Sequence, residues 1–189
     1  MAEGVDETDK ARRFRDAALP HLDAVYTLAR YLLRNPADAD DAVQECYLRA
    51  LRHFDSVRGS SIKPWLLAIL RNVCRAEYDR RCRQEQPGLE EGQAGDAVTP
   101  MWREPEDTLE AASARGDDTE RMRRLIASLP EPFRETLVLR EIEDLSYREI
   151  AEAISAPVGT VMSRLARARA LLRDAWQADR HEGGSDGLQ

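Results

Sequence analysis

Apolar residues recur along most of this chain at the three- and four-residue spacing of amphipathic helices, and no segment alternates for long as a strand would. One such pattern covers residues 19–33. The next begins at Asn35-Pro36, where an N-cap residue precedes a proline at the first helical position, and Asp38 follows in the first turn. This helix continues to about His53, and a third is predicted from about Pro64. The first half is therefore a predicted helical bundle.

The second half contains a predicted helix-turn-helix. Two helices, at 119–128 and 131–141, are separated by a proline-containing turn. The segment Ser146-Tyr147-Arg148-Glu149 has the sequence of a capping box, and the apolar residues on either side of it stand at the positions of a hydrophobic staple. The short helix that it starts, 146–154, is followed after a tight turn by a longer helix from about 158 to 176.

A segment rich in glycine, proline and acidic residues separates the two halves and has no sustained apolar period. We therefore expect an all-α chain of two small helical domains joined by an acidic flexible linker, with the helix-turn-helix in the C-terminal domain. The expected parts are an acidic N-terminal tail (1–14), a first helical domain (15–83), the linker (84–118), a second domain (119–176) and a flexible tail (177–189).

Composition limits the function classes. The longest apolar run, Trp65 to Leu70, has six residues, whereas a membrane-spanning helix needs roughly 20. The acidic N-terminus does not have the basic start and apolar stretch of a signal peptide. Cys46, Cys74 and Cys82 form neither a CxxC motif nor a Cys/His cluster. We expect a cytoplasmic protein with no membrane insertion, disulfide framework, bound metal or cofactor.

The net charge of −7 is unevenly distributed. Residues 84–120 hold 11 acidic and 2 basic side chains, whereas residues 11–83 hold 14 basic and 9 acidic ones. Because salt screens charges over about 10 Å, these local balances matter more for binding than the total. Arginine supplies 26 of the 28 basic residues, and its planar guanidinium suits phosphates and base edges.

The helix expected at 158–176 has separate apolar and outward faces. Val161, Leu165 and Ala168 fall within one narrow stripe on a helical projection. No acidic residue lies between Glu152 and Asp174. This pattern favours insertion into a major groove, although an amphipathic helix with a solvated arginine face is the simpler alternative. The outward residues, with the two at their edge, are Thr160, Met162, Ser163, Arg164, Ala166 and Arg167.

In the helix expected from Pro64, basic residues again lie on the face opposite the apolar stripe. The loop before this helix is polar and contains one glycine. Basic side chains beside such a loop suit single-stranded DNA. The signal is weak by itself, and Trp65 is better explained as a core residue than as a base-stacking platform.

Together these segments resemble the extracytoplasmic-function (ECF) group of bacterial RNA polymerase sigma factors. The resemblance lies in NPADADDAVQECYLRALRHF and KPWLLAILRNVCRAEYDRR in the first half. In the second half it lies in LPEPFRETLVLREIEDLSYREIAEAI and PVGTVMSRLARARALL. It covers about residues 15–83 and 119–176, in the order that the family has.

The resemblance implies a factor that binds core RNA polymerase, recognises a promoter, assists strand opening and contributes no covalent chemistry. The helix with Asp38, Asp41, Gln44 and Glu45 would dock on the clamp helices of the largest catalytic subunit, and the C-terminal domain would pack on the flap. An anti-sigma factor is an expected further partner, and a role in stress responses is typical of the group.

The resemblance also implies two DNA sites. The outward residues of the helix-turn-helix would read the duplex minus-thirty-five element, with Arg148 on a phosphate. Many relatives have Lys or Arg in place of Met162, so the promoter preference does not transfer. The single-stranded minus-ten element would meet candidates in the loop after Phe54 and the helix after Pro64, namely Arg58, Ser60, Arg71, Asn72, Arg75 and Arg80.

Three other classes of protein fit the sequence less well. A helix-turn-helix regulator that never docks on polymerase leaves the ordered first half unexplained. An acidic helical adaptor would show no DNA affinity. An enzyme is disfavoured because the sequence has no Gly-rich phosphate loop, HExxH or GxSxG motif, and His21, His53 and His181 are scattered.

Overall fold

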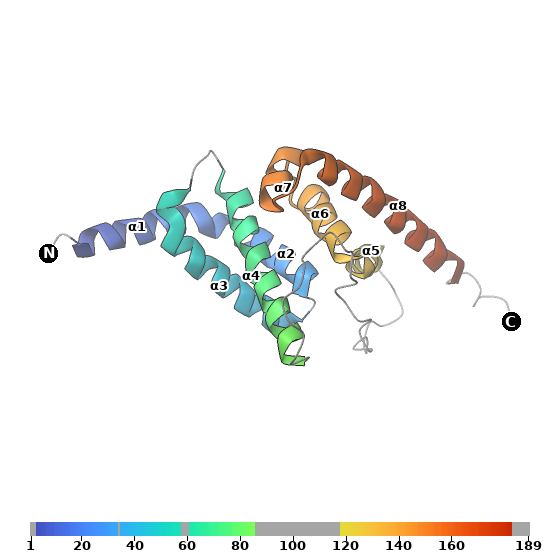
Figure 1. The fold of residues 1–189 in the computed structure, drawn as a ribbon, viewed down its shortest axis with the longest axis horizontal. Coiled ribbons are helices and arrows are strands. Elements are labelled where there is room, and N and C mark those ends of the chain that lie inside the picture. The colour runs from blue at the N-terminus through green and yellow to red at the C-terminus, as the bar shows by residue number, and fades with distance from the viewer. Residues whose placement is uncertain (1–2, 34, 58–60, 86–117, 183–189) are drawn as a thin grey trace.

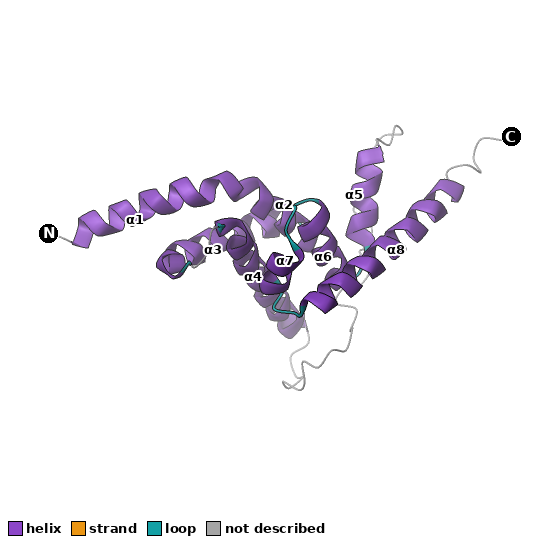
Figure 2. Cartoon of the chain, turned by 90° about the horizontal axis from the view of Figure 1, so that it is seen from above, coloured by secondary structure: helices purple, strands orange, loops and turns teal. Residues whose placement is uncertain are grey.

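The structure, a computed structural model, describes residues 3–33, 35–57, 61–85 and 118–182, and these parts contain helices and no strand. The helices form two groups that lie side by side, with the start of α1 and the end of α8 at opposite ends of the molecule (Figures 1 and 2). Their bounds are α1 Glu3–Ala18, α2 Leu22–Leu33, α3 Pro36–His53, α4 Ile62–Glu85, α5 Asp118–Ser128, α6 Glu131–Glu141, α7 Tyr147–Ala153 and α8 Val158–Glu182, with short 3₁₀ turns η1 at Leu19–His21 and η2 at Phe54–Ser56.

Helices α2, α3 and α4 pack against one another and form the first bundle. Their helical periodicity places Leu28, Leu66 and Leu70 in the core with no exposed surface. The start of α3 is as the sequence predicts, because the Asn35 side chain accepts a hydrogen bond from the Ala37 amide at 2.9 Å and Pro36 occupies the first turn.

The expected N-terminal tail is instead a helix. Acidic composition suggested a tail, but α1 runs from Glu3 to Ala18 and ends against the first bundle. Phe14 is buried and makes edge-on ring contacts with Tyr47 and Phe54. The sequence prediction was wrong here because the apolar surface that orders α1 comes from α3 and η2, which are distant in the sequence.

The second group is built around α6, whose residues Arg134 to Leu139 are all buried. Arg134 closes the turn before α6, because its Nη1 donates to the carbonyl oxygens of Ala127 and Leu129 at 2.8 and 3.1 Å. Helices α7 and α8 both contact α6. The expected helices at 119–128 and 131–141 are thus confirmed.

The capping box at the start of α7 is confirmed. The Ser146 amide donates to Glu149 Oε2 at 2.8 Å, and the Glu149 amide donates to Ser146 Oγ at 3.3 Å. Leu145 and Ile150, the expected hydrophobic staple, are buried. Ser155 then adopts a left-handed φ of 53°, and the Ala156 amide donates to the Ala151 carbonyl at 2.9 Å, which ends α7 and turns the chain into α8.

Helix α8 continues beyond the expected end at Trp176. It reaches Glu182, so the segment expected to be a flexible tail is helical at its start. Arg121 of α5 forms an ion pair with Asp179 and lies over the Trp176 ring, 4.6 Å from its centroid. These contacts between α5 and α8 could not be inferred from the polar composition of the segment. Most of the expected linker, residues 86–117, lies outside the described residues.

The two helical groups pack directly against each other. Helix α2 contacts α6, and α4 contacts α7. At the centre of this contact Arg71 Nε donates to Glu135 Oε1 at 2.7 Å, and both residues are buried. At its edge Lys63 Nζ lies 2.8 Å from Glu143 Oε2 and also donates to the Glu143 carbonyl. We call this arrangement the closed contact.

Burial raises the pKa of the Glu135 carboxyl, and the adjacent Arg71 guanidinium opposes that rise. Taking two charges out of water costs free energy that their attraction recovers only while both partners are present. The Arg71–Glu135 pair therefore makes the closed contact sensitive to the loss of either side chain.

Removing the Ser146 hydroxyl tests the capping box. Ser146→Ala should lower the free energy of unfolding by about 1 kcal/mol at neutral pH, measured by urea denaturation. Ser128→Ala is the control, since that exposed hydroxyl donates only to Leu125 of its own helix. The hydrogen bonds from Ser146 lower the pKa of Glu149. Their contribution to the free energy of unfolding is therefore present above the ordinary carboxyl pKa and is lost as pH falls through the lowered pKa. An equal effect of both substitutions would contradict the role of the cap.

Glu135→Ala tests the closed contact. It leaves the Arg71 guanidinium buried without its partner, a change that typically costs about 3–5 kcal/mol. We expect the two groups to separate, seen as a larger radius of gyration in small-angle X-ray scattering with unchanged helical circular dichroism. Glu141→Ala, which breaks the exposed pair with Arg169, should leave the radius unchanged. A compact Glu135→Ala protein would refute this role of the pair.

Candidate nucleic-acid and polymerase interfaces

The helix-turn-helix presents the expected outward face of α8. Val161, Leu165 and Ala168 are buried and fix α8 on its domain. On the other side Met162, Ser163, Ala166 and Arg167 are exposed, whereas Thr160 and Arg164 are partly buried at the edge, as the helical projection placed them.

This face is positively charged. Arg148 on α7 and Arg167 on α8 are exposed, and no carboxylate of the described residues forms an ion pair with either. Arg169 is different, because its guanidinium is held by Glu141 of α6 at 2.6 Å. The face thus offers two guanidinium groups, one at the start of α7 and one within the first half of α8, the helix that in helix-turn-helix proteins contacts base edges.

The candidate residues on α4 for binding single-stranded DNA differ in exposure and in their ion pairs. Asn72 and Arg75 are exposed. Arg80 is exposed and bonded to Glu77 of its own helix at 2.6 Å. Arg71 is turned into the closed contact, so in this arrangement its guanidinium is covered by α6. Two further candidates, Arg58 and Ser60, lie outside the described residues.

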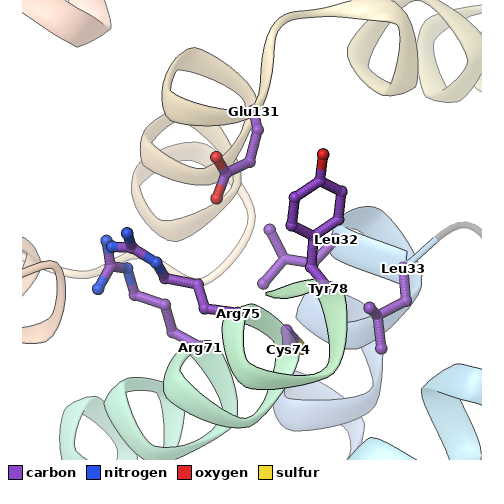
Figure 3. Close-up of a pocket in the computed structure, with 7 residues that line it drawn as sticks. All are labelled: Leu32, Leu33, Arg71, Cys74, Arg75, Tyr78 and Glu131. Carbon is purple, nitrogen blue, oxygen red and sulfur yellow. The ribbon is translucent and has the colours of Figure 1, made fainter. Parts of the chain in front are cut away.

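A small open pocket lies where the two groups meet. Figure 3 shows Arg71 and Arg75 of α4 and Glu131 of α6 among the residues that line it. Its apolar floor comes from Leu32, Leu33 and Cys74. The pocket has the character of an interdomain seam, in which cations of α4 meet carboxylates of α6.

Sequence reasoning missed the partners in this seam, Glu135, Glu143 and Lys63. Glu135 lies between Arg134 and Thr136, so the local sequence does not distinguish it from an exposed carboxylate. Nothing in the sequence indicates that its partner is Arg71, which lies 64 positions earlier.

Helix α3 has one buried and one acidic face. Ala39, Ala42, Val43, Cys46 and Ala50 are buried against the bundle. Asp41 and Gln44 are exposed, and Asp38 and Glu45 are partly exposed. Glu45 pairs with Arg49 at 2.6 Å on the same surface. The four expected polymerase-binding residues therefore share one solvent-facing surface, and Leu48, which sequence reasoning did not single out, lies beside them at 52% exposure.

Cys46 and Cys74 are buried free thiols, and burial raises the pKa of each to about 12. At neutral pH both are protonated and poorly nucleophilic. Within the described part of the chain no three His, Cys, Asp or Glu residues are grouped so as to hold a metal ion. None of its helices is long and apolar enough to span a bilayer.

Two segments of the chain match models of known protein families. Residues 18–84 match the family model described as Sigma-70 region 2, and residues 119–172 match that described as Sigma-70, region 4. The two matches contain α2 to α4 and α5 to α8 respectively, apart from Glu85, Asp118 and the end of α8.

Individual relatives agree with these matches. The chain is 36% identical over 166 residues to the ECF RNA polymerase sigma factor EcfG of Rhodopseudomonas palustris, covering 87% of this chain and 84% of the relative. It is 34% identical to the ECF RNA polymerase sigma factor SigE of Mycolicibacterium smegmatis, covering 82% of this chain but only 58% of that longer protein.

Among solved structures, the sigma factor RpoE from Bartonella quintana, in complex with the anti-sigma factor NepR, superposes with a TM-score of 0.68. The sequence identity is 26%, and the match covers 89% of this chain and 99% of RpoE. Both sigma regions, their order in the chain and the fold agree. The chain therefore belongs to the ECF family of RNA polymerase sigma factors.

Proposed function

We propose that this protein is an alternative sigma factor that binds core RNA polymerase, selects promoters through two DNA contacts and assists strand opening. One observation supports this most strongly: the exposed Arg148 of α7 and Arg167 of α8 and the acidic surface of α3 occur in separate domains of one chain. The protein supplies no covalent chemistry and acts in the cytoplasm, where polymerase is found.

The acidic surface of α3 is the proposed polymerase contact. Its carboxylates at Asp38, Asp41 and Glu45 favour a basic partner surface, here the clamp helices of the largest subunit. The exposed Leu48 adds apolar area to the same surface. The domain at 119–176 is proposed to contact the flap.

The two DNA sites are proposed to act on different forms of the promoter. The outer face of α8, with Arg148 of α7, is positioned for the duplex minus-thirty-five element. The loop before α4 and the exposed Asn72 and Arg75 are proposed for the melted minus-ten strand. Arg71 can join them only when its pair with Glu135 is broken, so promoter opening requires the closed contact to separate.

An anti-sigma factor is a proposed regulator. The solved relative from Bartonella quintana is held by an anti-sigma factor, and the closed contact seen here is a form that such a partner can stabilise. Affinity purification of the tagged chain from its own cells should recover this partner beside polymerase subunits. Recovery of polymerase alone under many growth conditions would argue against the regulator.

The main experiment adds the purified chain to bacterial core polymerase and maps transcript starts on promoter fragments. Initiation at defined sites is expected. The other candidate function, a helix-turn-helix regulator without polymerase docking, predicts duplex binding but no initiation by the reconstituted enzyme, and that result would overturn the proposal.

Arg167→Ala should weaken duplex binding at the upstream element by about 1–3 kcal/mol, because it removes an exposed guanidinium placed to contact a base edge. Binding is measured by fluorescence anisotropy of the holoenzyme on upstream-element duplexes. The matched control is Arg123→Ala on α5, another exposed arginine, which should change affinity little. Equal affinities of the Arg167→Ala and wild-type proteins would exclude this contact.

Asp41→Lys combined with Glu45→Lys should abolish co-elution with core polymerase in gel filtration, because the charge of the docking face is reversed. Helical circular dichroism should be retained, since Asp41 is exposed and the partly exposed Glu45 pairs with Arg49 of the same helix. Asp16→Lys with Asp174→Lys makes the same change in net charge at exposed sites outside α3 and should not affect co-elution. Normal co-elution of the α3 variant would refute the docking surface.

A further inference from the structure

Two large apolar side chains are exposed at the start of α8. Val158 is 42% exposed and Met162 is 54% exposed. They lie four residues apart and are therefore neighbours on one face of the helix, which the exposed Ala166 continues. The packing of α8 uses a different face, whose central residues Val161 and Leu165 are buried. The exposed pair is thus not part of the core and is available to a ligand.

The surroundings of this pair favour an anionic ligand. Four arginines and no acidic residue lie between Glu152 and Asp174. Arg148 and Arg167 are exposed on the same helix-turn-helix. Arg167 follows Met162 by five residues and therefore lies to one side of the apolar line, and Arg169 is held by Glu141. An apolar line beside cationic side chains suits a polyanion that also presents apolar groups at its surface. Duplex DNA is such a ligand, because phosphates line its grooves and thymine places a methyl group in the major groove.

We propose that Met162, assisted by Val158, contacts the C5-methyl group of a thymine in the duplex element bound by α8, and so sets a preference for thymine at that position. The inference rests on the proposed function and specifies which base the protein prefers in the duplex element. A thioether side chain makes at best weak hydrogen bonds to base edges, and the thymine methyl is the apolar group that base pairs offer in the major groove.

The chemistry of the two side chains agrees with this role. Methionine is unbranched and flexible, so Met162 can follow the groove floor while the arginines hold the phosphates. Val158 is in the first turn of α8, where side chains of a recognition helix come closest to the bases. Removing one methyl group from such a contact should weaken binding about threefold to tenfold.

The test uses the holoenzyme and begins with selection of its preferred upstream duplex from a random pool. Each thymine of the selected element is then replaced by deoxyuridine, which removes the methyl group and leaves every hydrogen-bonding group in place. With the wild-type chain, one replacement should weaken binding about threefold to tenfold. With Met162→Ala, the thymine and deoxyuridine duplexes should bind equally.

Two further variants separate the methyl contact from general effects. Met162→Leu keeps an apolar side chain and should retain the preference for thymine over deoxyuridine. Leu19→Ala truncates an apolar residue of similar exposure, 49%, in the other half of the chain and should also retain it. All of these side chains are exposed, so folding is not at risk.

Three results would overturn the inference. The first is a selected element in which no deoxyuridine replacement changes wild-type affinity. The second is methyl sensitivity that persists in Met162→Ala. The third is a Met162→Ala protein that loses polymerase affinity with unchanged DNA preference, which would assign the pair to a protein partner. Failure to select any duplex sequence would instead overturn the proposed function itself, and this inference with it.

Discussion

The buried ion pair between Arg71 and Glu135 is the interaction on which the arrangement of the two domains depends. Apolar packing is continuous between the two domains, because buried residues of both belong to one cluster. Within this contact, cations of α4 meet carboxylates of α6 and the loop after it. Such a pair holds only while both charges stay together, because either one alone in a buried site is strongly unfavourable. The seam is therefore suited to two discrete states, closed or separated.

This constraint connects the fold to the function of the family. A sigma factor must offer one surface to polymerase, one to duplex DNA and one to melted DNA. In the closed structure the acidic face of α3 and the outer face of α8 are accessible, whereas Arg71 on α4 is covered. Under the proposed function, the surface for melted DNA is therefore the one that the domain contact restricts.

The conformation of the helix-turn-helix depends on both local and distant interactions. Ser146 and Glu149 fix the start of α7 through contacts within four residues, and Ser155 turns the chain between the helices. The orientation of α8 comes from its packing on α6 and α7, which leaves Arg167 and Met162 facing solvent. A rigid scaffold of this kind is what allows a few exposed side chains to discriminate between base pairs.

The sequence alone determined the features that depend on short-range chemistry: the all-α class, the N-caps at Asn35 and Ser146, and the division of α3 and α8 into buried and outward faces. Periodicity and capping are local, so the residues that cause them are adjacent in the chain. Only the tertiary structure decided that α1 is a helix, that α8 extends to Glu182, and that Arg71 faces Glu135. Those features depend on contacts between residues far apart in the chain. Arg121–Asp179 and Arg71–Glu135 join residues 58 or more positions apart, and Phe14 meets Tyr47 and Phe54 from 33 or more positions away. No local pattern specifies such partners.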